Sequence, residues 1–313
     1  MMNLKNLFME KQVIKKKFIL LGEVESINIE LIIKSFSFVK DKVYYVLLCN
    51  RNDIVKNIYF KKSKIKINEI INPIDFSNYN KTMLNIFNLE NVSKKKYINL
   101  LNQINVANNL SNITKYDLIT MPINKAIFKK KINFIGMTEY LGAINKKSTI
   151  MLMHGDNFSI IPMTTHINIK DVSKSINVKT INYFLKTVFK NIQSKTYSLN
   201  FKKVKFICYN PHCGEEGTLG KEDILLKKTI QRNKKIKGPY PADSAFSKIE
   251  KNTLFISTYH DQALIPFKIL NKKSMNITLG LNYIRLSPAH GTAKEIKNKS
   301  LSDNTSYLKC LLY

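Results

Sequence analysis

The chain has 313 residues, of which 44% are hydrophobic and 23% are charged. These values exclude a wholly disordered chain, a collagen-like repeat and a coiled coil, and they allow one large or two modest folded domains. The formal net charge is +29, but only three of the 51 basic residues are arginine. Nucleic-acid recognition favours arginine, whose planar guanidinium pairs with phosphates and base edges. We therefore attribute the lysine excess to compositional bias and do not expect a nucleic-acid partner.

The cysteines and the first residues indicate the compartment. Cys49, Cys208, Cys213 and Cys310 show no CxxC spacing, which favours reduced thiols in the cytosol. Residues 1–12 are too charged for a signal peptide, and no apolar run in the sequence approaches the 18 residues that a membrane-spanning helix needs. We expect a cytoplasmic protein that does not contact a membrane.

The predicted elements alternate between short apolar strands and helices. Strands are predicted for six apolar stretches, at residues 17–22, 42–49, 116–121, 158–163, 204–209 and 253–258. Helices are predicted between them, at residues 94–110, 178–193 and 221–232. The second helix carries one apolar stripe at helical spacing, formed by Ile181, Phe184, Leu185, Val188, Phe189 and Ile192. This alternation predicts an α/β protein with a largely parallel sheet covered by helices.

Three of the five histidines follow the ends of predicted strands. His166 follows SIIPMTT, His212 follows KFICYNP and His260 follows LFISTY. Because ligands of an open α/β sheet bind beyond the carboxyl ends of its strands, we expect these imidazoles to converge. Three neutral imidazoles suit a divalent metal that keeps a free position for water or a substrate oxygen. The alternative is that each histidine only caps its strand, and His154, in the turn-like sequence HGDN, is expected to be an exposed hairpin residue.

Carboxylates lie near these histidines. Asp261 directly follows His260, and Asp243 lies between the last two of the six predicted strands. Such carboxylates orient metal-bound imidazoles or act as acid and base, and otherwise they are helix caps or surface groups. Imidazole ligands favour zinc or cobalt, whereas a site that shares oxygen ligands with a substrate suits magnesium or manganese.

Seven segments then follow in a fixed order: MPINK (residues 121–125), GMTE (136–139), TTH (164–166), NPHCGEEGTLGKED (210–223), GPYPADSAF (238–246), YHDQALIPFK (259–268) and NITLGLNYIRLSPAHGTA (276–293). Together they resemble the 4-hydroxythreonine-4-phosphate dehydrogenase family of vitamin B6 biosynthesis. Each segment is weak alone, but seven in the family's order make a specific match over more than half of the chain.

The resemblance implies a fold and an assembly. The fold is the two-domain α/β/α architecture of isocitrate and isopropylmalate dehydrogenases, with the active site in the cleft between domains. Residues 1–125 and 286–313 would form the first domain. Residues 126–285 would form the second, which would carry the metal ligands and most dimer contacts. The resemblance also implies a homodimer in which the partner subunit completes the site.

The resemblance implies an activity as well. The family oxidises the C3 hydroxyl of 4-phosphooxy-L-threonine with NAD or NADP, and the resulting β-keto acid loses carbon dioxide to give 3-amino-2-oxopropyl phosphate. A divalent metal such as zinc, cobalt or magnesium would be bound by His166, His212 and His260. The metal would acidify the substrate alcohol and stabilise the developing alkoxide.

Further site residues follow from the matching motifs. Substrate would be bound at Met137, Thr138, Lys268, Asn276 and Arg285. The adenosine end of the cofactor would be held by His290, Gly291, Thr292 and Ala293. We expect Asp243 and Asp261 to support the metal site, and Lys125 to add a charge in the cleft.

Three departures from the family pattern affect this site. The family's loop GDPAGIGPE is replaced by GEVESINIE at residues 22–30, Met137 replaces the histidine of the GHTE motif, and residues 294–300 lack the usual glycines. Weak activity, a different phosphorylated hydroxy acid as substrate, and a non-catalytic remnant all stay open as alternatives. The net charge of +29 leaves a further alternative open, a non-enzymatic binding protein that uses its basic surface.

Overall fold

The computed structural model describes residues 14–313, so residues 1–12, for which we expect no signal peptide, lie outside the described part. The strands are β1 (Lys16–Leu20), β2 (Tyr44–Cys49), β3 (Ile67–Glu69), β4 (Leu84–Asn88), β5 (Asp117–Thr120), β6 (Ile150–Gly155), β7 (Ser159–Pro162), β8 (Lys203–Ile207), β9 (Ile236–Tyr240), β10 (Thr253–Ser257), β11 (Ser274–Leu279) and β12 (Arg285–Pro288). The helices are α1 (Asn28–Val39), α2 (Arg51–Val55), α3 (Ile58–Lys62), α4 (Lys96–Thr114), α5 (Met137–Ile144), α6 (Val172–Ser175), α7 (Val178–Ile192), α8 (Glu222–Ile230), α9 (His260–Leu270) and α10 (Thr305–Leu312). The predicted α/β class is confirmed.

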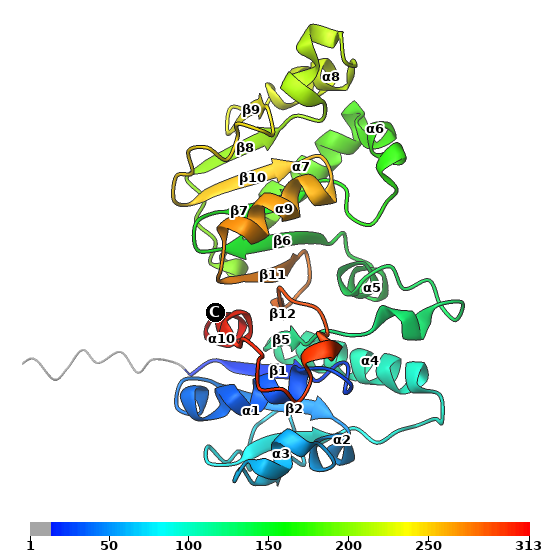
Figure 1. The fold of residues 1–313 in the computed structure, drawn as a ribbon, viewed down its shortest axis with the longest axis vertical. Helices are drawn as coiled ribbons and strands as arrows, with labels where there is room; N and C mark the ends of the chain where they lie inside the picture. Colours follow the sequence, from blue (N-terminus) through cyan, green and yellow to red (C-terminus); the bar gives the residue numbers. More distant parts are fainter. Residues whose placement is uncertain (1–13) are drawn as a thin grey trace, which may run out of the picture.

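All of these strands belong to one sheet that runs along the long axis of the molecule (Figure 1). Its order is β3-β4-β2-β1-β5-β12-β11-β6-β7-β10-β8-β9. Most neighbouring strands are parallel, as predicted, but β11 is antiparallel to both β12 and β6, and β6 is antiparallel to β7. The sheet is continuous across the expected domain boundaries, because β12 pairs with β5 on one side and β11 on the other. The division into two domains stays a prediction.

Alternate residues of the strands face two different apolar layers. On β1, Ile19 packs in a layer that includes residues of α1, α7, α8 and α10. Its neighbours Phe18 and Leu20 face the opposite layer, which α4 covers. At the other end of the sheet, Phe255 of β10 packs against α9. The central strands β1 and β10 are therefore buried on both faces, which explains why they are apolar runs in the sequence, whereas the edge strands β3 and β9 are more exposed.

The predicted elements that position the site are present. The six predicted strands correspond to β1, β2, β5, β7, β8 and β10, and the three predicted helices to α4, α7 and α8. The apolar stripe of α7 is buried, except that Phe189 is only partly covered. A membrane-crossing helix, which needs both length and an apolar surface, does not occur between residues 14 and 313.

The hairpin at His154 forms, but the expected exposure of this side chain is wrong. His154 pairs with Ser159 across the antiparallel strands β6 and β7, and its Nδ1 lies 2.8 Å from the Ser159 hydroxyl. The side chain is largely covered because the ring of Tyr313 packs edge-on against it. Burial lowers the pKa of His154 to about 4, below its ordinary value of 6.5.

This burial predicts a pH-dependent loss of stability. The folded state resists protonation of His154, so its contribution is complete above about pH 6.5 and is lost as the pH falls toward 4, by about 3 kcal/mol at pH 4. The measurement is urea unfolding of the wild type and of His154→Gln at pH 7.5 and pH 4.5. The wild type should lose more stability between the two pH values than the variant, which shares every other titrating group. An equal loss in both would contradict the assignment.

Candidate active site

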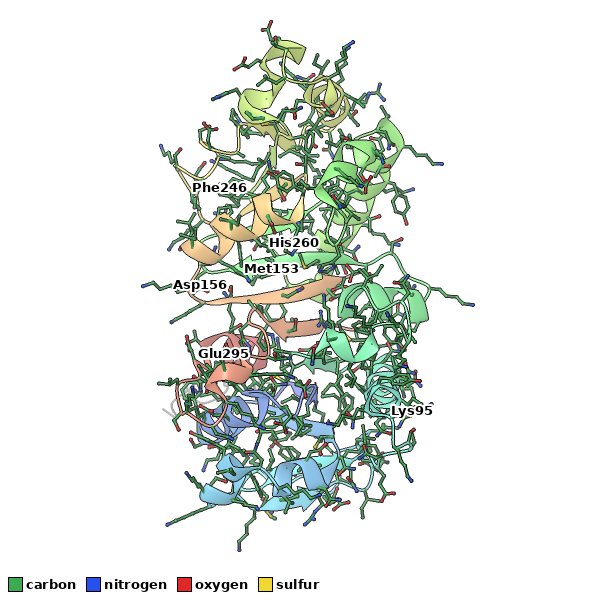
Figure 2. The ribbon with its side chains drawn as sticks, turned by 45° about the vertical axis from the view of Figure 1, so that its right-hand side comes forward. Lys95, Met153, Asp156, Phe246, His260 and Glu295 are labelled. Carbon is green, nitrogen blue, oxygen red and sulfur yellow. The ribbon has the colours of Figure 1, made fainter. Side chains whose placement is uncertain are left out.

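The strands β7 and β10 bring two of the three predicted metal ligands together. They are parallel neighbours whose last residues, Pro162 and Ser257, lie side by side. Beyond the strands the two chains stay joined, because the backbone amide and hydroxyl of Thr164 both donate to the carbonyl oxygen of Thr258. His166 and His260 follow, and their ring centroids are 5.7 Å apart. Figure 2 shows His260 at the first turn of α9.

Each of these histidines has a carboxylate at the same ring nitrogen. His166 Nδ1 lies 3.0 Å from Oε1 of Glu139, and His260 Nδ1 lies 2.7 Å from Oδ1 of Asp261. A carboxylate at Nδ1 favours the tautomer whose Nε2 carries a free lone pair, which is the usual arrangement of metal-bound histidine. Both rings line one cavity of about 240 Å³, together with Asp261. This donor set fits a divalent cation.

Glu139 is a site residue that was not singled out from the sequence, although it ends the GMTE motif. It lies in the first turn of α5, and its Oε1 also accepts a hydrogen bond from Thr165. Burial alone would raise the pKa of Glu139, but the hydrogen bonds from His166, its own backbone amide and Thr165 together lower it to about 2. The carboxylate is therefore ionised at neutral pH.

His212 does not join this pair within one protomer. The strand before it, β8, is a parallel neighbour of β10 as expected, but His212 lines a separate cavity of about 600 Å³ next to α8. Within residues 14–313, no three histidine, cysteine, aspartate or glutamate side chains come close enough to hold a metal ion. The single chain thus assembles two of the three expected ligands.

The loop that carries His212 has an unusual backbone. Five successive residues adopt left-handed conformations, and four of them are not glycine: His212, Cys213, Glu215 and Glu216, with φ between 44° and 57°. Each such residue costs roughly 1–2 kcal/mol, and strain of this kind is concentrated at functional sites. The start of the loop is held by Asp223 of α8, whose carboxylate accepts from the backbone amides of Tyr209 and Asn210.

A buried guanidinium is linked to the histidine pair through α5, because Arg285 donates to Thr138, the neighbour of Glu139, and Glu139 contacts His166. Arg285 begins β12 and is only 4% exposed. Its hydrogen bonds within residues 14–313 all go to threonine hydroxyls, on Thr120, Thr278 and Thr138. Burial lowers the pKa of Arg285 to about 10, so the group stays charged at neutral pH. A buried cation without a bonded carboxylate suits an anionic group of a ligand.

Two other predicted substrate residues lie close to this guanidinium: Thr138 accepts a hydrogen bond from it, and Asn276 lies on the same face of the sheet. Thr138 follows the first residue of α5, Met137, which packs into an apolar cluster with Phe128. Asn276 lies two residues before Thr278 on β11, so both side chains share the face of the sheet that carries Arg285. The Asn276 Oδ1 atom is buried and has no hydrogen-bond partner in the described chain.

Three predicted residues lie outside this cluster. Lys268 is exposed in the last turn of α9, eight residues and therefore about 12 Å along the helix from His260. Lys125 is exposed and donates to the carbonyl oxygen of Ile135, just before α5. Asp243 is exposed in the loop between β9 and β10. Of the two carboxylates expected to support the histidines, only Asp261 touches one.

The predicted cofactor loop follows β12. The Nδ1 of His290 donates to the carbonyl oxygen of Gly291, while its Nε2 is buried and unpartnered within residues 14–313. Burial also lowers the pKa of His290. A side chain added at Gly291 would meet no atom within 4 Å, so the loop is open at this point. The backbone of Thr292 contacts the loop at residues 22–30, whose sequence differs from that of the family, because the Thr292 carbonyl oxygen accepts a hydrogen bond from the amide of Ile27.

Two of the departures from the family pattern contact each other. Glu25, from the replaced loop at residues 22–30, pairs with Lys297 at 2.5 Å, and Glu23 pairs more loosely with Lys294 at 3.7 Å. Glu30 of α1 accepts from Ser302 and pairs with Lys34. Charged pairs thus join the two segments that lack the family's glycines.

The chain is similar to known proteins over most of its length. The profile of the family described as Pyridoxal phosphate biosynthetic protein PdxA matches residues 41–313. The 4-hydroxythreonine-4-phosphate dehydrogenase of Hydrogenobaculum sp. (strain Y04AAS1) is 40% identical over 195 residues, which cover 61% of this chain and 62% of that relative. The protein of the same name from Helicobacter pylori (strain G27) is 31% identical over 317 residues, which cover 96% of this chain and 98% of the relative.

A solved structure shares the fold. The crystal structure of 4-hydroxythreonine-4-phosphate dehydrogenase from Klebsiella pneumoniae superposes with a TM-score of 0.75 at 22% identity, covering 95% of this chain and 97% of that one. The motif order, the family match and the relatives agree. The chain belongs to the PdxA family of dehydrogenases, which acts in vitamin B6 biosynthesis.

Proposed function

We propose that this chain oxidises the C3 hydroxyl of 4-phosphooxy-L-threonine with NAD or NADP and releases carbon dioxide from the product, giving 3-amino-2-oxopropyl phosphate. The observation that carries the proposal is the pairing of two carboxylate-bound histidines, His166 and His260, with the buried guanidinium of Arg285 nearby. Four free thiols are in keeping with a cytosolic location for this enzyme.

A divalent cation would be held by the Nε2 atoms of His166 and His260. Zinc, cobalt and magnesium stay as candidates. Such a cation acidifies a bound alcohol and stabilises negative charge that develops on its oxygen. Asp261 and Glu139 would keep the two rings oriented.

The third metal ligand would be His212 of the partner subunit in a homodimer. Two features support this assembly: His212 lies away from the other two histidines, and its strained loop lines an open cavity. Apolar side chains are exposed beside both the histidine pair and the His212 loop: Ile167 and Ile169 follow His166, and Leu219 follows the loop. A second copy that covers them would bury apolar surface and supply the missing imidazole.

The substrate's anionic groups would be bound by Arg285, with Thr138 and Asn276 beside it. Four hydrogen bonds to threonine hydroxyls fix Arg285 and leave one of the five N–H donors of its guanidinium free, and a charge-assisted bond to a phosphate or carboxylate would use that donor. We further propose that Lys125, Lys268 and Asp243 contribute to the site once the dimer has assembled. Each is exposed in the protomer and is therefore free to contact a substrate or the partner subunit.

The nicotinamide cofactor would be held through its adenosine end by residues 290–293. The buried, unpartnered Nε2 of His290 and the open backbone at Gly291 support this assignment. A planar base or a ribose hydroxyl that reaches this loop would supply the partner that His290 lacks.

The test is a direct assay. Purified protein receives 4-phosphooxy-L-threonine, NAD or NADP, and zinc, cobalt or magnesium, and reduced nicotinamide is followed by absorbance at increasing enzyme concentration. Reduced cofactor and released carbon dioxide in equal amounts support the proposal. Turnover only with another phosphorylated hydroxy acid from a panel would change the substrate, and no turnover by metal-loaded protein with any of them would overturn the enzymatic assignment.

The Met137 departure predicts a gain of activity in one variant. Met137→His restores the histidine of the family motif at the start of α5. A hydrogen bond to a charged group is worth about 1.5–3 kcal/mol, so kcat/KM should rise on the order of 10-fold or more. Met137→Gln, which is polar but neutral, serves as the control and should gain less. Unchanged kcat/KM in Met137→His would show that the substrate does not depend on this position.

A further inference from the structure

One carboxylate of the site, Glu139, is held more rigidly than its counterpart Asp261. The Glu139 side chain leaves the first turn of α5, and its Oε1 accepts from both the His166 ring and the Thr165 hydroxyl, at 3.0 and 3.1 Å. Its Oε2 is buried, without a hydrogen-bond partner in the described part of the chain. The Asp261 side chain, in contrast, is 72% exposed, so solvent competes for its bond to His260.

The packing around Glu139 depends on Gly136. This residue has extended backbone angles that any amino acid adopts, so its conformation does not require glycine. The space does: a Cβ added at Gly136 would clash with Oε2 of Glu139 and would lie 3.2 Å from Cε1 of His166. Gly136 therefore lets the backbone close over the contact between the carboxylate and the imidazole.

From this geometry we infer that Glu139 is a positioning residue that fixes His166 in the tautomer with a proton on Nδ1 and a free lone pair on Nε2, facing His260. The inference rests on the proposed metal site. Glu139 acts through His166 and not by touching the substrate. Because α5 also supplies Thr138 beside Arg285, one helix turn would set both the metal ligand and the anion site. Loss of a carboxylate that orients a metal-bound histidine typically lowers metal affinity by about 10- to 100-fold.

The first measurement uses the metal-free protein. The chain has only five histidines, so long-range ¹⁵N–¹H spectra at pH 8 resolve the tautomer of each ring, and His166→Asn assigns the signal of interest. The wild type should show His166 protonated on Nδ1. Glu139→Ala should shift the ring toward protonation on Nε2, whereas Glu139→Gln, which keeps an acceptor oxygen, should retain more of the original tautomer.

The second measurement is zinc and cobalt affinity by competition with a chromophoric chelator. Glu139→Ala should bind about 10- to 100-fold more weakly than the wild type, and Glu139→Gln should lie between them. Asp261→Ala is the matched control at the second histidine and should lose less affinity, because its bond is exposed. Gly136→Ala removes no polar group but pushes the Glu139 carboxylate aside, so it should also weaken metal binding. This variant keeps the test available if Glu139→Ala fails to fold.

The outcomes separate this inference from the proposed function. An unchanged His166 tautomer in both Glu139→Ala and Gly136→Ala would overturn the role of Glu139, whatever the enzyme's activity. A changed tautomer together with weaker metal binding supports it. If the wild type binds neither metal while its tautomer still depends on Glu139, the metal site fails and the positioning of His166 stands.

Discussion

Replacement of Arg285 by methionine is expected to lower kcat/KM by about 10- to 150-fold, because one charge-assisted bond to the substrate is lost at about 1.5–3 kcal/mol. The same change should leave the free energy of unfolding within about 1 kcal/mol of the wild type. A buried guanidinium is costly to desolvate, and an apolar side chain of similar length removes that cost. The Thr138 and Thr278 hydroxyls keep each other as partners at 3.1 Å.

Two measurements check this expectation without relying on each other. Steady-state kinetics gives the change in kcat/KM, and urea unfolding gives the change in stability. In addition, inorganic phosphate should raise the melting temperature of the wild type and not that of Arg285→Met, because a ligand that binds only the folded state stabilises it. Arg285→Lys is the matched control and should recover little, since an ammonium group cannot replace the guanidinium fork between the threonines. Equal phosphate stabilisation of wild type and Arg285→Met would place the anion site elsewhere.

Loss of any one of His166, His212 or His260 is expected to reduce turnover about 1,000-fold, because each would remove several kcal/mol of transition-state stabilisation through the metal site. Metal binding should fall in parallel. His154→Gln, which changes a histidine outside the site, is the control and should keep both. Retained metal affinity in His212→Ala would exclude His212 from the site.

A mixture of variants tests where the third ligand comes from. When His166→Ala and His212→Ala chains are unfolded together and allowed to reassociate, half of the dimers should contain one of each. If each site takes His166 and His260 from one chain and His212 from the other, a mixed dimer has one intact site, and the mixture should recover about a quarter of wild-type activity. If all three ligands came from one chain, every site would be defective and the mixture would stay inactive.

The strands that carry the site could be predicted from short sequence patterns. Residues 158–163 and 253–258 are apolar on both faces, and such runs form parallel strands buried in the centre of a sheet. Strand ends then place His166 and His260 at one edge, where the structure has them. This part succeeds because burial of each strand depends mainly on its own composition.

Exposure and pairing could not be predicted in the same way. The sequence HGDN indicates a turn, but His154 lies at the end of β6, where Tyr313, which is far along the chain, packs edge-on against it. The antiparallel pairing of β11 with β12 and β6 also depends on which strands meet in the folded sheet, because β6 and β11 are more than 100 residues apart in the chain. The role of Glu139 could not be predicted, because it arises from contacts with Thr165 and His166, which lie 26 and 27 residues further along the chain.

The sequence by itself determined the α/β class, the family, and the residue types of the site: three histidines at strand ends, a rare arginine, and the motif that ends in Glu139. Only the tertiary structure decided that two imidazoles meet in one protomer while His212 stays apart, and that Arg285 is buried among hydroxyls. The reason is physical. Strand and helix formation follow from the hydrophobic pattern of neighbouring residues, whereas ligand geometry and desolvation depend on contacts between segments that the chain brings together only when it folds.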